Sequence, residues 1–132
     1  MSHLQYYTYA GFGEYVLEHT HYNQAVRIDN IIKTAGQGGW DRTTREVPDD
    51  IFEQINRTFD NVEHTLSQAG ASWRNVYAVR LYHTADLPED GVKHFVECMR
   101  KWMPDHSPIL SGIGVASLAF GMKVEVEVEA HV

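Results

Sequence analysis

Three glutamates alternate with three valines near the end of the chain, in the run V-E-V-E-V-E-A from Val124 to Ala130. Successive side chains of a β-strand point to opposite faces, so the glutamates share one face of a sheet and the valines the other. Carboxylates on a face that a ligand or another copy of the chain covers can exchange protons with water and with a substrate nitrogen. The pattern alone favours a solvated acidic face, because exposed glutamates are the common case.

The other residue types that carry catalytic or metal-binding chemistry form no strong motif. The chain has eight histidines, but none of them makes an H-x-x-x-H pair, and its one cysteine, Cys98, has no C-x-x-C partner. Cys98 lies beside the apolar stripe of an expected helix, without a basic neighbourhood that would activate a thiol. We therefore expect no metal site and no cysteine nucleophile.

Composition points to one globular domain, residues 1–132, since 132 residues suffice for a single core. The net charge of −7 disfavours nucleic acid as a partner, because phosphate backbones are bound by clustered Lys and Arg. The first residues, M-S-H-L-Q-Y-Y-T, contain neither a basic segment nor a long apolar run. We expect a protein of the cytosol that does not interact with membranes.

Two helices are predicted from apolar residues at spacings of three and four. The first runs from Asp50 to Gly70, with an aspartate cap at its start and a glycine stop at its end. The second opens in the segment Asp86-Leu87-Pro88-Glu89 and ends at Pro104. Six β-prone runs accompany the helices. Two of them flank a hairpin turn at Asp29-Asn30, and the other four cover residues 4–9, 75–84, 108–116 and 122–132.

This order predicts an α+β fold with two helices on one face of a six-stranded mixed sheet. The three valines then face the helices, and the three glutamates lie on the uncovered face. Such a face either meets water or packs against another copy of the chain.

Five short motifs resemble those of the Rid family of reactive-intermediate deaminases, also called the YjgF or L-PSP endoribonuclease family. Each motif is weak alone, but their number and order are specific for a fold. They are H-Y-N-Q-A-V-R at 21–27, T-A-G-Q-G-G-W-D at 34–41, A-G-A-S-W-R-N-V at 69–76, G-V-A-S-L at 114–118 and V-E-V-E-A at 126–130.

The resemblance implies a chorismate-mutase-like β-β-α-β-α-β fold that assembles as a homotrimer, with a cleft between each pair of subunits. It also implies hydrolysis of an enamine or imine to a ketone or keto acid and ammonia, without a metal or organic cofactor. Carried over by motif, the glutamate that positions water is Glu127 and the cleft tyrosine is Tyr22. Residues expected to contact substrate are Leu110, Ser111, Gly112, Gly36, Gln37, Trp40, Arg80 and His21. Trp40 has a second interpretation, which is packing at the sheet edge.

The chain departs from this family at the residue that binds the substrate carboxylate. The family has arginine followed by serine or threonine before its G-V-A stretch, whereas this chain has Leu110-Ser111. Leucine offers neither charge nor hydrogen-bond donor, so small 2-imino acids lose their anchor. A second departure is Ala35, where the family often has serine.

Three outcomes of the missing arginine remain open: another cation replaces it, the substrate lacks a carboxylate, or turnover is lost. Arg80, His21, His83 and His106 are the candidate replacements. The alternatives to imine hydrolysis are a cyclase or tautomerase acting on a bulky unsaturated intermediate and a non-catalytic trimeric ligand-binding or chaperone-like protein.

Overall fold

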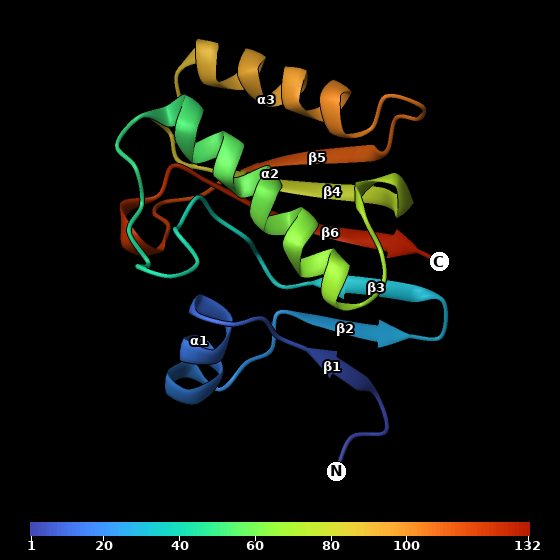
Figure 1. Cartoon of the computed structure of the whole chain (residues 1–132). Coiled ribbons are helices and arrows are strands. Elements are labelled where there is room, and N and C mark those ends of the chain that lie inside the picture. The colour runs from blue at the N-terminus through green and yellow to red at the C-terminus, as the bar shows by residue number, and fades with distance from the viewer.

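The fold was analysed in a computed structural model that describes all 132 residues (Figure 1). Three α-helices and two short 3₁₀ segments accompany six strands. In chain order the elements are β1 (Gln5–Tyr7), α1 (Phe12–Thr20), β2 (Ala25–Ile28), β3 (Ile31–Thr34), α2 (Ile51–Gln68), η1 (Trp73–Asn75), β4 (Val76–His83), α3 (Glu89–Trp102), β5 (Ile109–Gly114), η2 (Ala119–Gly121) and β6 (Val124–His131).

The six strands form one mixed sheet in the order β1-β2-β3-β6-β4-β5. Strands β4 and β5 are parallel and are joined through α3, and the other neighbouring pairs are antiparallel. The predicted two-residue turn at Asp29-Asn30 joins β2 to β3, with Asp29 at a φ of 53°. Strand β6 lies at the centre of the sheet, between β3 and β4.

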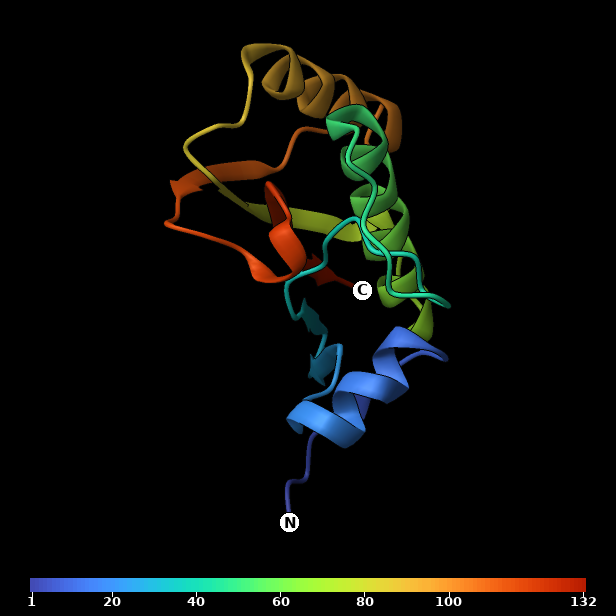
Figure 2. The ribbon, with the colours of Figure 1, turned by 90° about the vertical axis from the view of Figure 1, so that its left-hand side faces the viewer.

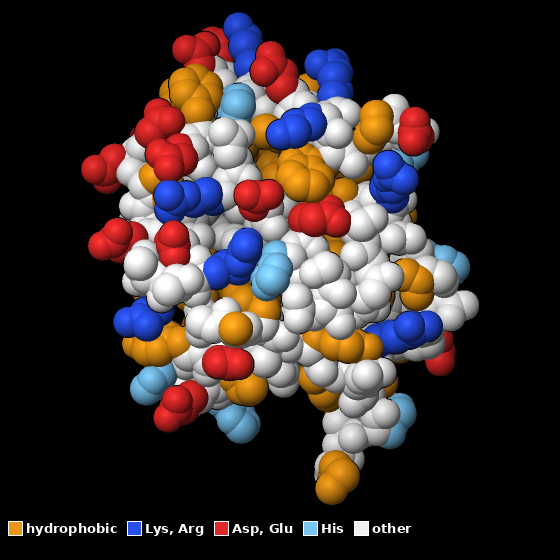
Figure 3. Space-filling view, in the orientation of Figure 1, with side chains coloured by type: hydrophobic (Ala, Val, Ile, Leu, Met, Phe, Trp, Pro, Cys, Tyr) orange, Lys and Arg blue, Asp and Glu red, His pale blue; other side chains and the backbone are white.

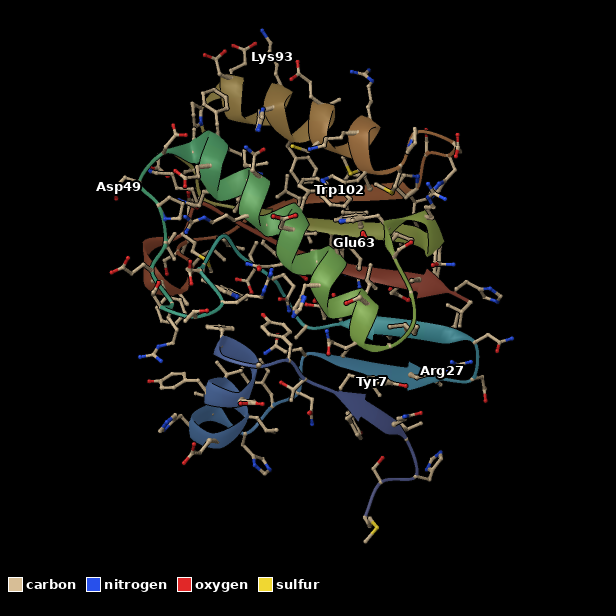
Figure 4. The ribbon with its side chains drawn as sticks, viewed as in Figure 1. Tyr7, Arg27, Asp49, Glu63, Lys93 and Trp102 are labelled. Carbon is tan, nitrogen blue, oxygen red and sulfur yellow. The ribbon has the colours of Figure 1, made fainter.

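Helices α2 and α3 cover one face of the sheet, as predicted, and the opposite face carries no α-helix (Figure 2). The valines of β6 are fully buried beneath these helices, with Phe59 of α2 and Phe95 of α3 in the same core. Tyr7 of β1 and Trp102 of α3 pack against this core from well-separated parts of the fold (Figure 4). The alternation in the last strand therefore places its glutamates on the face without helices.

Helix α2 has both of its predicted end signals. The side chain of Asp50 accepts a hydrogen bond from the backbone N–H of Glu53, which satisfies one of the free donors of the first turn. Just beyond the last turn, Gly70 has a φ of 78°, a conformation that glycine adopts without strain. These signals explain why the helix begins and ends within two residues of its predicted bounds.

A third helix, α1, lies beside the β1–β2 end of the sheet (Figure 1). Its start contains Gly11 and Gly13, which lower the intrinsic helix propensity of the segment. The helix forms because Phe12 and Val16 enter a second apolar cluster with Tyr9, Trp40 and Met122. The rings of Phe12 and Trp40 stack with their centroids 3.9 Å apart.

Acidic and basic side chains are interspersed over the face that carries α2 and α3 (Figure 3). This face therefore has no broad basic field of the kind that binds a phosphate backbone. None of the helices is both long enough and apolar enough to cross a lipid bilayer.

Candidate functional site

An ionic cluster occupies the centre of the sheet face without helices. Arg80 and Tyr82 of β4 lie opposite Glu127 and Glu125 of β6 in the strand register, so all four side chains share this face. The guanidinium of Arg80 donates from Nε to Oε1 of Glu127 at 2.6 Å and from Nη1 to Oε2 of Glu129 at 3.0 Å. The carboxylates of Glu127 and Glu129 are thus both held by one cation.

Glu127 is held by two donors on one of its oxygens. Besides Arg80, the Tyr82 hydroxyl donates to Oε1 at 2.5 Å, whereas Oε2 accepts no hydrogen bond from the protein. Partial burial acts to raise the pKa of Glu127, but the hydrogen bonds from Tyr82 and Arg80 outweigh it and hold the pKa below its ordinary value. The two donors come from the neighbouring strand β4, and the sequence alone did not reveal them.

Glu129 uses both of its carboxylate oxygens. Oε1 accepts a hydrogen bond from the Tyr77 hydroxyl at 2.9 Å, and Oε2 accepts the bond from Arg80. Tyr77 reaches this face because the register of β4 shifts between Val76 and Ala78, which is the geometry of a β-bulge. Of the two carboxylates bound by Arg80, only Glu127 has a free oxygen that can accept a hydrogen bond from water.

Glu125 is the one glutamate of the three without an ion-pair or hydrogen-bond partner among the side chains described above. Its carboxylate lies against Gly36, where a Cβ would come within 2.1 Å of Oε1. Burial, and secondly the charge of Glu127, raise the pKa of Glu125 above its ordinary value. Glu125 is therefore the one carboxyl group of the three whose pKa is raised, since those of Glu127 and Glu129 are lowered.

Replacing Glu125 by glutamine is expected to raise the melting temperature at neutral pH. A carboxyl group with a raised pKa in the folded state binds protons more tightly there, so its contribution to stability is lost as pH rises through that pKa. The advantage of the Glu125→Gln variant should shrink on acidification and vanish below about pH 4, where glutamate is protonated in both states. Melting curves at several pH values check this, and a variant that melts lower at pH 7 would contradict it.

A cleft of about 640 Å³ opens beside these glutamates, between β1, the residues before β2, and β3. Its lining includes both predicted residues of the H-Y motif, His21 and Tyr22. The pKa of Tyr22 is raised by burial and secondly by the charge of Glu125, so the Tyr22 hydroxyl and that carboxylate are close enough to interact electrostatically. Lys33 of β3 also lines the cleft.

The β5 residues lie at the other end of the sheet. Leu110 is in register with Val79, and Gly112 with Leu81, so both are on the helix side, whereas Ser111 is in register with Arg80 and shares the open face. Leu110 is 47 % exposed despite its position on the helix side, because β5 is an edge strand. Four strand spacings separate β5 from β2, a distance of about 19 Å. Within one chain, Leu110 and Tyr22 therefore cannot contact the same small molecule.

One family model matches most of the chain. The model of the family described as Endoribonuclease L-PSP matches residues 15–132. The chain belongs to this family. This match confirms the family that the five sequence motifs predicted, and the observed sheet confirms the predicted mixed six-stranded sheet.

Relatives within the L-PSP family cover most of this chain. The mitochondrial protein MMF1 of Saccharomyces cerevisiae is 30 % identical over 83 % of this chain and 73 % of its own length. A 2-iminobutanoate/2-iminopropanoate deaminase of Mus musculus is 29 % identical over 80 % of this chain and 77 % of its own length. The solved structure of the protein YJGH aligns with a TM-score of 0.85 and 25 % identity, covering 99 % of this chain and 98 % of that one.

Two residues of the L-PSP-like motif at 34–41 are buried rather than exposed to a ligand. Trp40 is 3 % exposed and donates from Nε1 to the Tyr9 hydroxyl at 3.2 Å, which matches its packing interpretation and does not fit the predicted contact with substrate. Gln37 is 0 % exposed. Its Oε1 accepts a hydrogen bond from Tyr9 at 2.9 Å, and its Nε2 donates to Gln24 at 2.7 Å, so its side chain has no free surface for a substrate.

The candidate replacements for the missing arginine are largely used by the protein itself. Arg80 binds Glu127 and Glu129, and a ring nitrogen of His106 lies 2.7 Å from the carbonyl oxygen of Val76. Of the predicted replacements, His21 lines the cleft. Lys33 was not among the predicted residues. Its alternation with the buried Ile32 places its side chain on the face away from the core, which is the face that carries Glu129.

Proposed function

We propose that this L-PSP family protein hydrolyses an enamine or imine to a carbonyl compound and ammonia, with a substrate range that Leu110 alters. The observation that carries this proposal is the free Oε2 of Glu127, an ionised acceptor held in place by Arg80 and Tyr82. The name of the mouse relative, an imine deaminase, supports the same reaction class.

In the proposed reaction, water adds to the carbon of a protonated imine. Glu127 accepts a hydrogen bond from the attacking water through Oε2, and this interaction directs the water oxygen toward the imine carbon. The new C–O bond forms as the C=N π bond breaks, and a water proton is transferred to nitrogen. The C–N bond then breaks as the C=O π bond forms, and the hydroxyl proton passes to the departing ammonia, which leaves the carbonyl product and an ammonium ion. No oxidant or reductant takes part.

We propose a homotrimer whose clefts combine residues of two subunits. The support is geometric: Tyr22 precedes β2 and Leu110 lies in β5, two strands about 19 Å apart in the sheet, so both residues can line one cleft only across subunits. Strand β5 also exposes apolar side chains at a free edge, among them Ile109 at 73 %. Sedimentation at working concentration tests the assembly, and a monomer would contradict it.

Ammonia release from freshly generated 2-iminopropanoate is expected to be slow compared with relatives that have the arginine. The physical reason is that Leu110 cannot form the paired, charged hydrogen bonds that bind a carboxylate next to the imine carbon. Replacing Leu110 by arginine should raise kcat/KM for this substrate by about tenfold or more, because a factor of this size corresponds to the free energy of a charged hydrogen bond. Initial rates corrected for spontaneous hydrolysis give both numbers.

The Val115→Arg substitution, just after β5 and away from the position of the family arginine, is the control for a nonspecific effect of added charge. A wild-type rate equal to that of an arginine-bearing relative would overturn the altered substrate range. Absence of ammonia release above the spontaneous rate with carboxylate-bearing and carboxylate-free imines alike would overturn the reaction itself.

The exposed apolar residues of β5 favour one second candidate, a cyclase or tautomerase acting on a bulky unsaturated intermediate. Ile109 and Ile113 are exposed on the open face of this strand and Leu110 on its other face, and such an apolar edge suits an apolar substrate better than a small 2-imino acid. Conversion of such an intermediate without ammonia release would favour this function.

A ribonuclease role is disfavoured by the net charge of −7. The cytosolic location stays a prediction, and the name of the yeast relative places that protein in mitochondria.

A further inference from the structure

Two charges of opposite sign, neither of them in a salt bridge, flank the cleft beside the central ionic cluster. Neither Lys33 nor Glu125 takes part in any salt bridge of the chain, whereas the neighbouring Glu127 and Glu129 are both bound by Arg80. The charge of Lys33 also acts at longer range on Glu127 and Glu129, whose pKa values it helps to lower. Lys33 lines the cleft, and no carboxylate side chain is part of that lining. Glu125 lies just beyond, against Gly36, on the side of Tyr22.

The strand register gives the separation of these two charges. Lys33 is directly opposite Glu129, and Glu125 is four residues earlier along β6 on the same face. At roughly 3.4 Å per residue along a strand and 4.8 Å between strands, their Cα atoms are about 14 Å apart. Long side chains shorten the gap between the charged groups but do not bring them together.

Along β6 the residue between the two charges on this face is Glu127, and the cleft beside it is lined largely by apolar and aromatic side chains. Tyr6, Val26 and Ile28 line the cleft on the side of β1 and β2, and Tyr22 and Ala35 lie toward Glu125. Tyr6, Val26 and Lys33 follow one another across neighbouring strands in the register, so they form a continuous surface. Such a surface suits an extended aliphatic or aromatic chain.

A small 2-imino acid does not match this charge distribution. Its carboxylate is bonded directly to the imine carbon, so its negative charge and its nitrogen lie close together, and it can approach only one of the two charged residues. A carboxylate beside Glu125 would also be repelled, since like charges at close range are unfavourable.

We propose that this cleft binds a ligand with a carboxylate at one end, held by Lys33, and a cationic nitrogen at the other end, near Glu125, with an apolar chain of several carbons between them. This inference rests on the proposed function for its identification of the substrate as an imine of this shape. The imine nitrogen is then placed on the sheet face that carries Glu127, and the carboxylate no longer requires an arginine at position 110.

The test is binding of 6-aminohexanoate, which has an ammonium and a carboxylate at the two ends of an aliphatic chain. Ligand-observed NMR with the full-length protein compares it with hexanoate, hexylamine and alanine. We expect 6-aminohexanoate to bind tightest and alanine weakest. Replacing Lys33 by methionine should weaken binding of 6-aminohexanoate and hexanoate by about tenfold, and Glu125→Gln should do so for 6-aminohexanoate and hexylamine.

Lys93→Met, at an exposed lysine of α3 on the opposite side of the sheet (Figure 4), is the matched control and should leave every affinity unchanged. Equal affinities for 6-aminohexanoate, hexanoate and hexylamine, or equal effects of the Lys33 and Lys93 substitutions, would overturn the proposal. Binding in the expected pattern without hydrolysis of any imine would refute the proposed reaction and leave the cleft assignment standing. Hydrolysis of imines without this binding pattern would support the proposed reaction and refute the cleft assignment.

Discussion

Replacing Glu127 by glutamine is expected to lower kcat for imine hydrolysis by about 10²-fold or more, a typical contribution of a positioned acid or base. The reason lies in the hydrogen bonds of this side chain. Both Arg80 and Tyr82 donate to Oε1, so the amide of the variant must present its own oxygen to them. Its NH₂ group then occupies the place of Oε2, and a donor replaces the acceptor that orients water. Initial rates with the best imine substrate measure the effect.

Glu129→Gln is the matched control for this experiment. Glu129 lies two residues along the same strand face and shares the guanidinium of Arg80, but both of its oxygens already have protein partners. Its substitution should therefore change kcat much less than that of Glu127. Equal losses in the two variants would assign the effect to the ionic cluster as a whole, and an unchanged rate in Glu127→Gln would remove Glu127 from the reaction. Melting curves should show that both variants remain folded.

Helices α2 and α3 and the order of the elements along the chain were predictable, because local signals specify each of them. Helix α2 has an apolar stripe, a capping aspartate and a terminal glycine, and its observed bounds, Ile51–Gln68, follow from them. The β2–β3 turn is likewise encoded in two residues that tolerate positive φ. Helix α1 was only partly predictable, because its stability comes from contacts of Phe12 with Trp40, which lies far along the chain.

The side chains around each glutamate were not predictable, because they depend on strand pairing. Alternation correctly placed Glu125, Glu127 and Glu129 on one face, but it could not tell which of them faces Arg80. The position of Leu110 depends on the register of β5 against β4, and a shift of one residue would have moved it to the open face. The bulge that brings Tyr77 to Glu129 has no clear signal in the sequence either.

These three glutamates show how identical residues in one repeat acquire different chemistry. Tyr77 and Arg80 satisfy both oxygens of Glu129, Tyr82 and Arg80 satisfy one oxygen of Glu127, and neither group reaches Glu125. The pKa values follow, since donors lower that of Glu127 while burial raises that of Glu125. An ionised acceptor and a carboxyl group that protonates more readily thus lie two residues apart on one strand.

Replacing Gln37 by leucine is expected to destabilise the fold by about 2–5 kcal/mol, because it leaves buried polar partners without hydrogen bonds. Leucine keeps a similar volume, so the loss reports the polar network rather than a cavity. The Tyr9 hydroxyl loses its acceptor, and Oε1 of Gln24 loses its donor, in a side chain whose Nε2 already has no partner. Urea unfolding measures the change. Gln68→Leu, at an exposed glutamine of α2, should change stability by no more than about 0.5 kcal/mol.

A double variant that combines Tyr9→Phe with Gln37→Leu separates a structural role for Gln37 from the predicted contact with substrate. Because the Tyr9 hydroxyl donates directly to Gln37, its removal eliminates one of the groups that Gln37→Leu leaves unpaired. The double variant should therefore be more stable than the sum of the two single effects predicts. A substrate contact would produce the opposite result, a raised KM with unchanged unfolding and additive effects. The network also joins Tyr9, before α1, to Gln24, before β2, so its loss should loosen the segments that place Tyr22 beside Glu125.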